Sequence, residues 1–251
     1  MSTSYGALCS DFYVNQKLAL KMDLPHDRET ILHLFDQVRK AMPLMDRFRR
    51  YQGELALESS RRDAEYRWLA LRRTSIRTGH VNPESMRDAF KLHKLILELA
   101  PYHLTISPLD IDYVELLYGF DLECKNNHDA VVYEALFSTP QSPLSNLLKV
   151  PDGRVLDVQP IWGLSLSDKG DTQAYFEVRT RTKNRKGRAT KSRHEPISIF
   201  LTLRKYGPVQ QIEHLQDHFK ILAEYAETLA AEKLVPSLLT PIARQITSSS
   251  T

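Results

Sequence analysis

The sequence predicts an α+β protein built mainly from an antiparallel sheet of about seven strands with helices packed on it. Three observations predict this class. Apolar residues make up 42% of the 251 residues and charged residues 26%, as in ordinary globular proteins. Segments in which every second residue is apolar mingle with segments of helical spacing. These segments do not follow the regular strand–helix alternation of a doubly wound parallel sheet.

The first half predicts strand, helix, strand, strand, helix and strand, which is the ferredoxin-like βαββαβ order. We expect strands at 7–21, 48–58, 66–73 and 106–124, and helices at 27–42 and 83–100. Three of these segments end at a proline, namely Pro25, Pro43 and Pro101. The second helix has the clearest start. Asn82 is a capping residue, Pro83 suits the first helical position, and Glu84 suits the positive end of the helix dipole.

The second half predicts a helix, three strands and a helix, the order αβββα. One or two short helices are expected within 126–149 and strands at 155–167, 173–183 and 196–206. The last helix begins near Val209, and Pro236 and Pro241 interrupt its tail. Its apolar residues alternate in steps of three and four: Ile212, Leu215, Phe219, Leu222, Ala226 and Leu229. Because this coiled-coil spacing covers fewer than three heptads, we expect the helix to pack on its own sheet, with a homodimer as the alternative.

Two α+β halves are therefore expected, at residues 1–125 and 126–247, with one continuous domain as the alternative and a frayed tail at 248–251. No segment approaches the ~20 consecutive apolar residues that span a bilayer. The N-terminus lacks the basic and apolar regions of a secretory signal. Two cysteines, Cys9 and Cys124, are too few for a disulfide scaffold. These features predict a cytoplasmic protein that does not bind membranes.

Charge is concentrated in one short stretch. Eight of the sixteen residues 179–194 are basic and none is acidic. The whole chain has 34 Lys and Arg against 31 Asp and Glu, so the remainder has 26 basic residues against 31 acidic ones. A stretch of this kind favours a polyanionic partner such as nucleic acid or a phosphorylated ligand.

The strands on either side of the basic run predict a mixed cationic and aromatic surface. Alternation puts Tyr175, Arg179 and Arg181 on one face of the first strand. On the second strand it puts Phe200, Arg204 and Tyr206 opposite an apolar face. Since cations neutralise phosphates and aromatic faces stack on bases, the predicted polyanion-binding residues are Arg179, Arg181, Arg185, Lys186, Arg188, Arg204, Phe200 and Tyr206.

The basic run and a second group of arginines each have another interpretation. Charge runs are usually solvated, so the basic run is also typical of a solvated hairpin loop at a sheet edge. A structural homo-oligomer without a specific ligand is the corresponding alternative function. A second group of arginines, within residues 47–77, is interrupted by acidic residues and predicts cross-strand ion pairs.

A metal-dependent phosphodiesterase or nuclease is the enzymatic alternative. Acidic residues that could hold a hard cation are Asp110, Asp112, Glu115, Asp121 and Glu123, with His128 nearby. Pro151-Asp152 and Glu177-Val178-Arg179 resemble the PD-(D/E)xK core of metal-dependent nucleases, but Arg179 stands where that core needs a lysine. No phosphate-binding loop, dinucleotide fingerprint or nucleophile elbow is present. We therefore assign no catalytic residue, cofactor or metal ligand, and we favour a non-enzymatic binding protein.

Overall fold

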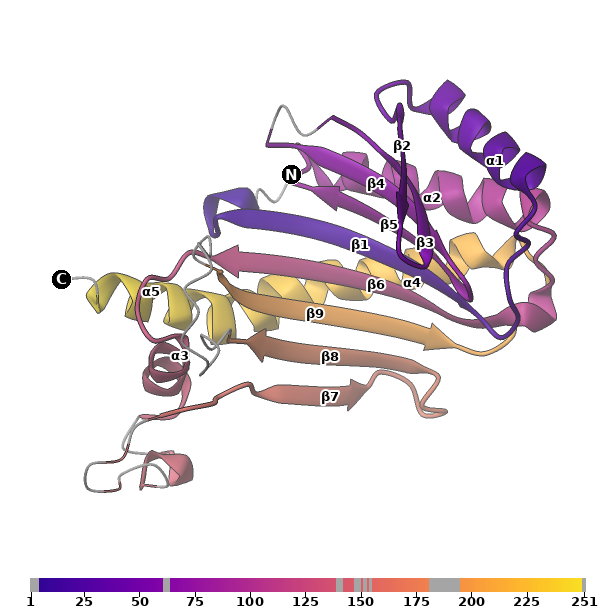
Figure 1. Ribbon diagram of the computed structural model, residues 1–251. Coiled ribbons are helices and arrows are strands. Elements are labelled where there is room, and N and C mark those ends of the chain that lie inside the picture. Colours follow the sequence, from indigo (N-terminus) through magenta and orange to yellow (C-terminus); the bar gives the residue numbers. More distant parts are fainter. Residues whose placement is uncertain are drawn as a thin grey trace.

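The computed structural model describes residues 5–60, 64–138, 142–146, 150, 153, 155–180 and 195–249 (Figure 1). In these segments the chain forms two layers, a nine-stranded antiparallel sheet and a layer of helices on one face of it. The strand order across the sheet is β2-β3-β4-β5-β1-β6-β9-β8-β7. The predicted α+β class with a large antiparallel sheet is confirmed, whereas the predicted number of seven strands is wrong.

The strands have the following bounds: β1 Asp11–Leu20, β2 Arg47–Tyr51, β3 Glu54–Glu58, β4 Tyr66–Arg72, β5 Ser75–Val81, β6 Ile111–Leu122, β7 Ile161–Ser165, β8 Thr172–Arg179 and β9 Ile197–Tyr206. The α-helices are α1 Arg28–Ala41, α2 Met86–His103, α3 His128–Leu136, α4 His214–Leu229 and α5 Thr240–Ser248. A π-helical segment, η4 Ala230–Leu239, joins α4 to α5, and short 3-10 turns are η1 Tyr5–Ala7, η2 Pro108–Asp110 and η3 Pro143–Asn146.

The two additional strands come from the first half. The segment predicted as one strand at 48–58 is the β2–β3 hairpin, which turns at Gln52 and Gly53. Gly53 has a φ of +73°, a conformation that glycine adopts without steric cost. The strand β5 was missed because only Ile76 of its inward residues is apolar, whereas the inward Thr78 and His80 are polar, so polar and apolar residues do not alternate along it. The first half thus runs βαββββαβ, and the predicted ferredoxin-like order is not confirmed.

The α2 helix begins later than Pro83 and ends later than Ala100. Its cap is Ser85, whose side chain accepts a hydrogen bond from the Asp88 N–H, and it continues through Pro101 to His103. Asn82 instead has a φ of +49°, which asparagine tolerates better than most residues. Its side chain accepts a hydrogen bond from the Phe12 N–H at 3.0 Å and so ties the loop before α2 to β1.

The second half follows the predicted order, from α3 through β7, β8 and β9 to α4. The strand β7 is shorter than the predicted 155–167, β9 begins one residue later than predicted, and β8 ends at Arg179, with the predicted residues 181–183 lying outside the described residues. The C-terminal helix does not break at its prolines, because Pro236 lies inside the π-helical segment and Pro241 lies in the first turn of α5. Four of the regularly spaced apolar residues of α4 are buried: Leu215, Phe219, Leu222 and Ala226. This seam packs on β6 and β9 of the same chain.

The two halves have matching arrangements of strands and helices on either side of the centre of the sheet. β1 pairs with β6 antiparallel at the centre, and each is followed by a helix, a run of antiparallel strands and a second helix. The last strand of each run, β5 or β9, pairs with the central strand of its own half. The sequence predicted a boundary at residue 125, but strands from both sides of it belong to one sheet. One apolar core also contains residues of both halves.

None of the helices in the described segments has both the length and the apolar character needed to span a bilayer.

Candidate functional site

The face of the sheet opposite the helices, here called the open face, carries the four predicted binding residues that the structure describes: Arg179, Phe200, Arg204 and Tyr206. On β9, Ile199, Leu201 and Leu203 belong to the apolar core, so Phe200 and Arg204 point the other way. On β8, Ala174, Phe176 and Val178 are core residues, and Arg179 shares the open face. The side-chain directions predicted from alternation on these two strands therefore agree with the structure.

Arg179 and Phe200 form a stacked pair on the open face. The Arg179 guanidinium carbon lies 5.3 Å from the centre of the Phe200 ring, and its Nε donates a hydrogen bond to Glu177 at 2.6 Å. The Tyr13 ring lies against another side of Phe200, with ring centres 6.3 Å apart. Phe200 is consequently only 8% exposed, and a ligand would meet Arg179 before it met the Phe200 ring.

Arg204 lies between two tyrosine rings. Its guanidinium carbon is 5.4 Å from the centre of the Tyr113 ring and 5.4 Å from that of Tyr175. Its Nε donates a hydrogen bond to Glu115 at 2.6 Å, and its Nη1 donates one to the Tyr206 hydroxyl at 3.5 Å. Burial lowers the pKa of Arg204, but the hydrogen bonds to Glu115 and Tyr206 raise it above the usual value. Since Glu115 and Tyr206 occupy two of the five N–H donors, three donors remain for a ligand oxygen.

The remaining predicted residues, Arg181, Arg185, Lys186 and Arg188, lie outside the described residues. The structure does place the two ends of the segment that contains them. Arg179 is the last residue of β8 and Ile197 the first residue of β9, and the two strands are neighbours in the sheet. The basic run is therefore attached at the end of β8 where Arg179 lies on the open face.

Sequence reasoning missed the aromatic residues that the first half adds to this face. A Cβ atom at Gly79 would collide with the indole of Trp68, and one at Gly119 would collide with the ring of Tyr13. In both pairs the aromatic residue and the glycine are direct cross-strand partners. Each ring thus lies across the backbone of a neighbouring strand instead of standing away from the sheet. The signal was the pairing of an aromatic residue with a glycine, which is visible only when strand register is known.

A third pair of this type lies at the other end of the sheet. Gly163 on β7 is paired with Tyr175 on β8, and a Cβ atom at Gly163 would lie 3.0 Å from the Tyr175 ring. The open face therefore carries three rings laid over glycines, at β4–β5, at the central pair β1–β6 and at the edge pair β8–β7.

The acidic residues predicted as a cation site do not converge among the described residues. Glu115 is bound to Arg204, whereas Asp121 accepts hydrogen bonds from Ser198 at 2.7 Å and from Tyr13 at 3.4 Å. These two carboxylates are six residues apart on β6, which corresponds to ~20 Å along a strand. Asp152, the first acid of the nuclease-like pattern, lies outside the described residues. Glu177, the second, is the ion-pair partner of Arg179.

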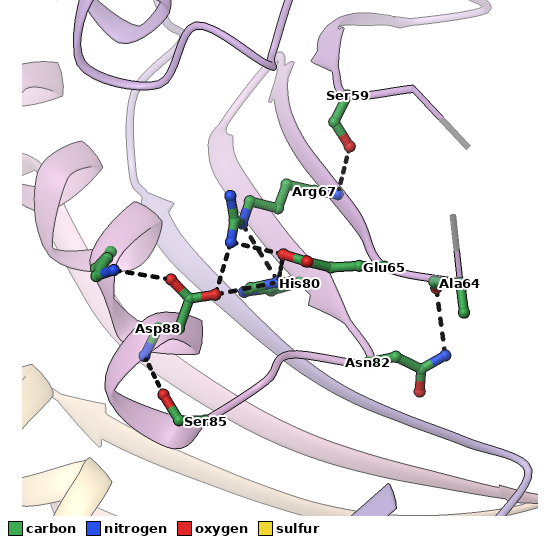
Figure 2. A network of polar contacts seen from close by, with 9 residues as sticks. Ser59, Ala64, Glu65, Arg67, His80, Asn82, Ser85 and Asp88 are labelled. Carbon is green, nitrogen blue, oxygen red and sulfur yellow. Dashed lines mark hydrogen bonds and ion pairs between the residues drawn. The ribbon is translucent and has the colours of Figure 1, made fainter. Parts of the chain in front are cut away.

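A different set of titratable groups does converge, on the helix-covered side of the sheet (Figure 2). Glu65, His80 and Asp88 each offer a ligand atom, all within 4.8 Å of one another. Arg67 holds the three together, with one nitrogen 2.6 Å from Glu65 and 2.6 Å from Asp88, and its Nε 3.3 Å from the His80 ring. Figure 2 shows the guanidinium between the two carboxylates.

This set has the character of a structural network rather than of a metal centre. Arg67 already supplies the positive charge that the carboxylates require. The Nδ1 atom of His80 is buried and has no hydrogen-bond partner among the described residues. Metal-binding histidines almost always donate their second N–H to an acceptor, and His80 lacks one. Burial raises the pKa of Asp88, but hydrogen bonds with Lys91 and the charge of Arg67 lower it below its usual value. The network thus fixes the start of α2 to β4 and β5.

No family model matches this chain, and no curated protein matches it. Among solved structures, it is similar to a chain in the crystal structure of A. aeolicus tRNASec in complex with M. kandleri SerRS. The two chains are 12% identical with a TM-score of 0.26, and the match covers 96% of this chain and 31% of that one. This chain therefore spans about a third of the length of the protein it matches, and a TM-score of this size carries no argument about fold or ligand.

Proposed function

We propose that this protein binds nucleic acid on the open face of its sheet, next to the basic run 179–194. The observation that supports this proposal most directly is the position of Arg179. It lies on the open face, stacks on Phe200 and directly precedes the run of seven further cations. Arg204 and three tyrosines lie on the same face of the same strands and of β6.

The chemistry of this surface suits phosphates and bases together. Arginine donates in a planar fork that matches phosphate oxygens, and tyrosine rings stack on bases. The basic run supplies positive charge that attracts phosphates whatever the base sequence. This electrostatic attraction accounts for a large share of the affinity of most nucleic-acid-binding proteins. Release of counterions from the nucleic acid then makes the affinity strongly dependent on salt.

The test is a salt titration of binding to a DNA duplex and to a single strand of about 20 nucleotides. Replacing Arg185, Lys186 and Arg188 with alanine should weaken binding and flatten the log–log salt dependence by up to about 0.9 per lost phosphate contact on duplex. The matched control replaces three exposed cations of α1, namely Arg28, Arg39 and Lys40, and should leave the slope unchanged. Equal slopes for the wild type and the 185/186/188 variant would refute a role for the basic run.

A further inference from the structure

We propose that the bound nucleic acid is a single strand that crosses the whole sheet, with phosphates along one row of cations and bases over the adjacent rings. This inference rests on the proposed function and goes further, because it names the form of the ligand and extends the site into the first half of the chain. Two neighbouring rows of residues on the open face support it.

The first row carries cations from one edge of the sheet to the other. The register of neighbouring strands aligns nine residues across the sheet, in the order Arg49, Ala56, Ala70, Arg77, Lys17, Glu115, Arg204, Gln173 and Ser165. Four of them are cations and one is an acid, and that acid is bound to Arg204. Neither Arg49 nor Arg77 makes an ion pair with any described residue. The row thus has positive charge that its own carboxylate does not neutralise.

The second row lies two residues further along every strand, at a distance of about 7 Å. In the same register it contains Arg47, Glu58, Trp68, Gly79, Asn15, Leu117, Thr202, Tyr175 and Gly163. Its single acid, Glu58, is buried and accepts a hydrogen bond from the Tyr51 hydroxyl at 2.8 Å. Its two rings, Trp68 and Tyr175, both lie over glycines. The third such ring, Tyr13 over Gly119, lies in the row beyond it. The three rings therefore lie on the same side of the cation row, at β4–β5, β1–β6 and β8–β7.

Trp68 and Tyr175 lie over glycines and remain partly exposed to solvent, so part of each ring is open to a ligand. An outward aromatic face stacks on any base, because every base has a π-face. Duplex bases are covered by their neighbours in the stack, so only unpaired bases use such a surface. The nine strands are separated by eight spacings of about 4.8 Å, so the sheet spans about 38 Å from the first strand to the last. This length suits an extended single strand. Among polyanions, the alternation of phosphates and flat bases matches the two rows, whereas an acidic peptide offers charge without rings.

The cation row is tested with a double variant, Arg49→Gln with Arg77→Gln. Single-strand binding should become weaker, and its log–log salt slope should fall by about 1.4, since each phosphate contact contributes about 0.7. The matched control is Arg50→Gln with Arg87→Gln. Arg50 is exposed on the same strand as Arg49 but on the opposite side of the sheet, and Arg87 is exposed on α2. This control removes the same charge and should leave the slope at the wild-type value.

The ring row is tested through Trp68 itself. The chain has two tryptophans, so Trp162→Phe leaves Trp68 as the single indole reporter. Stacking of a base should quench its fluorescence on addition of oligodeoxythymidylate but not of duplex. In addition, Trp68→Leu should weaken single-strand binding about tenfold, the size of one lost base–aromatic stack.

The outcomes separate this inference from the proposed function. Single-strand binding with no quenching of Trp68 and with a wild-type slope for the Arg49/Arg77 variant would overturn the inference alone, since the site would then lie in the second half only. Tighter binding of duplex that depends on the same residues would also overturn it. Failure of the wild type to bind any polynucleotide at low salt would overturn both proposals.

Discussion

His93 on α2 has no exposed surface, and its Nδ1 atom lies 2.6 Å from the Thr78 hydroxyl. Burial, and then the charge of nearby His80, lower the pKa of His93 to about 3. In the unfolded chain an imidazole titrates near 6.5. Between these two values the unfolded state binds more protons than the folded state, so stability falls as the pH is lowered from about 6.5 towards about 3.

We therefore predict that His93→Leu makes stability less dependent on pH. Thr78 keeps a partner in this variant, because its hydroxyl donates to Gln16 at 2.9 Å. Between pH 7 and pH 5 the wild type should lose about 2 kcal/mol more unfolding free energy than the variant. Urea denaturation at both pH values measures this difference, with the exposed His26→Gln as the control. Parallel losses in the wild type and in His93→Leu would contradict the prediction.

Arg67 permits a second prediction at the level of one side chain. Arg67→Met leaves Glu65 beside buried His80 without its arginine and leaves Asp88 with the exposed Lys91 as its remaining cation. The carboxylates of Glu65 and Asp88 are 33% and 17% exposed, so the cost should be below that of a fully buried pair, at about 2 kcal/mol. The control is Arg73→Met, whose ion pair with Asp23 is exposed and should be worth less than about 1 kcal/mol. Equal urea midpoints for the two variants would show that the network does not stabilise the fold.

Whole elements were predictable where apolar residues recur at every second position. The strands β4, β8 and β9 were found because core and open-face residues alternate along them. β5 was not found, because its inward polar residues are satisfied by groups far away in sequence. Thr78 binds Gln16 and His93, and His80 binds Glu65. A sequence pattern cannot identify such partners before the fold is known. The same is true of the glycine–ring pairs.

The pair of Gly119 and Tyr13 gives a prediction about the two central strands. Gly119→Ala places a methyl group where the Tyr13 ring lies, so the ring must move off the sheet. We expect a loss of about 1–3 kcal/mol in unfolding free energy, the usual range for overpacking. Gly6→Ala is the matched control, because a Cβ atom there meets no atom within 4 Å. A Gly119→Ala variant as stable as the Gly6→Ala variant would show that the ring has room to move without cost.

At the scale of the whole molecule, the sequence predicted two α+β halves. It could not show how they join, because the β1–β6 pairing links residues about a hundred positions apart in the chain. For the candidate site the sequence supplied Arg179, Phe200 and Arg204, all on neighbouring strands. The contribution of Arg49, Arg77 and Trp68 follows only from the strand order, which places the first half beside the second.

The shared sheet and core predict that the two halves unfold together. Trp68 lies in the first half and Trp162 in the second, so each single-tryptophan variant reports on one half. We propose to unfold Trp162→Phe and Trp68→Phe in urea and to follow each variant by tryptophan fluorescence and by circular dichroism. For each variant, the two probes should report one transition with the same midpoint. Fluorescence midpoints that depart from the circular dichroism midpoint in either variant would mean that the halves unfold separately.

The mirrored strand order has one consequence for direction. β4 and β5 in the first half correspond to β8 and β9 in the second, yet two residues, Arg73 and Thr74, join the first pair, whereas residues 180–196 join the other. A sheet with identical halves would present the same surface to a strand read from 5′ to 3′ and to one read from 3′ to 5′. The long basic connection in one half removes that equivalence. A strand bound across this sheet would therefore be held in one polarity, with a fixed end beside β8.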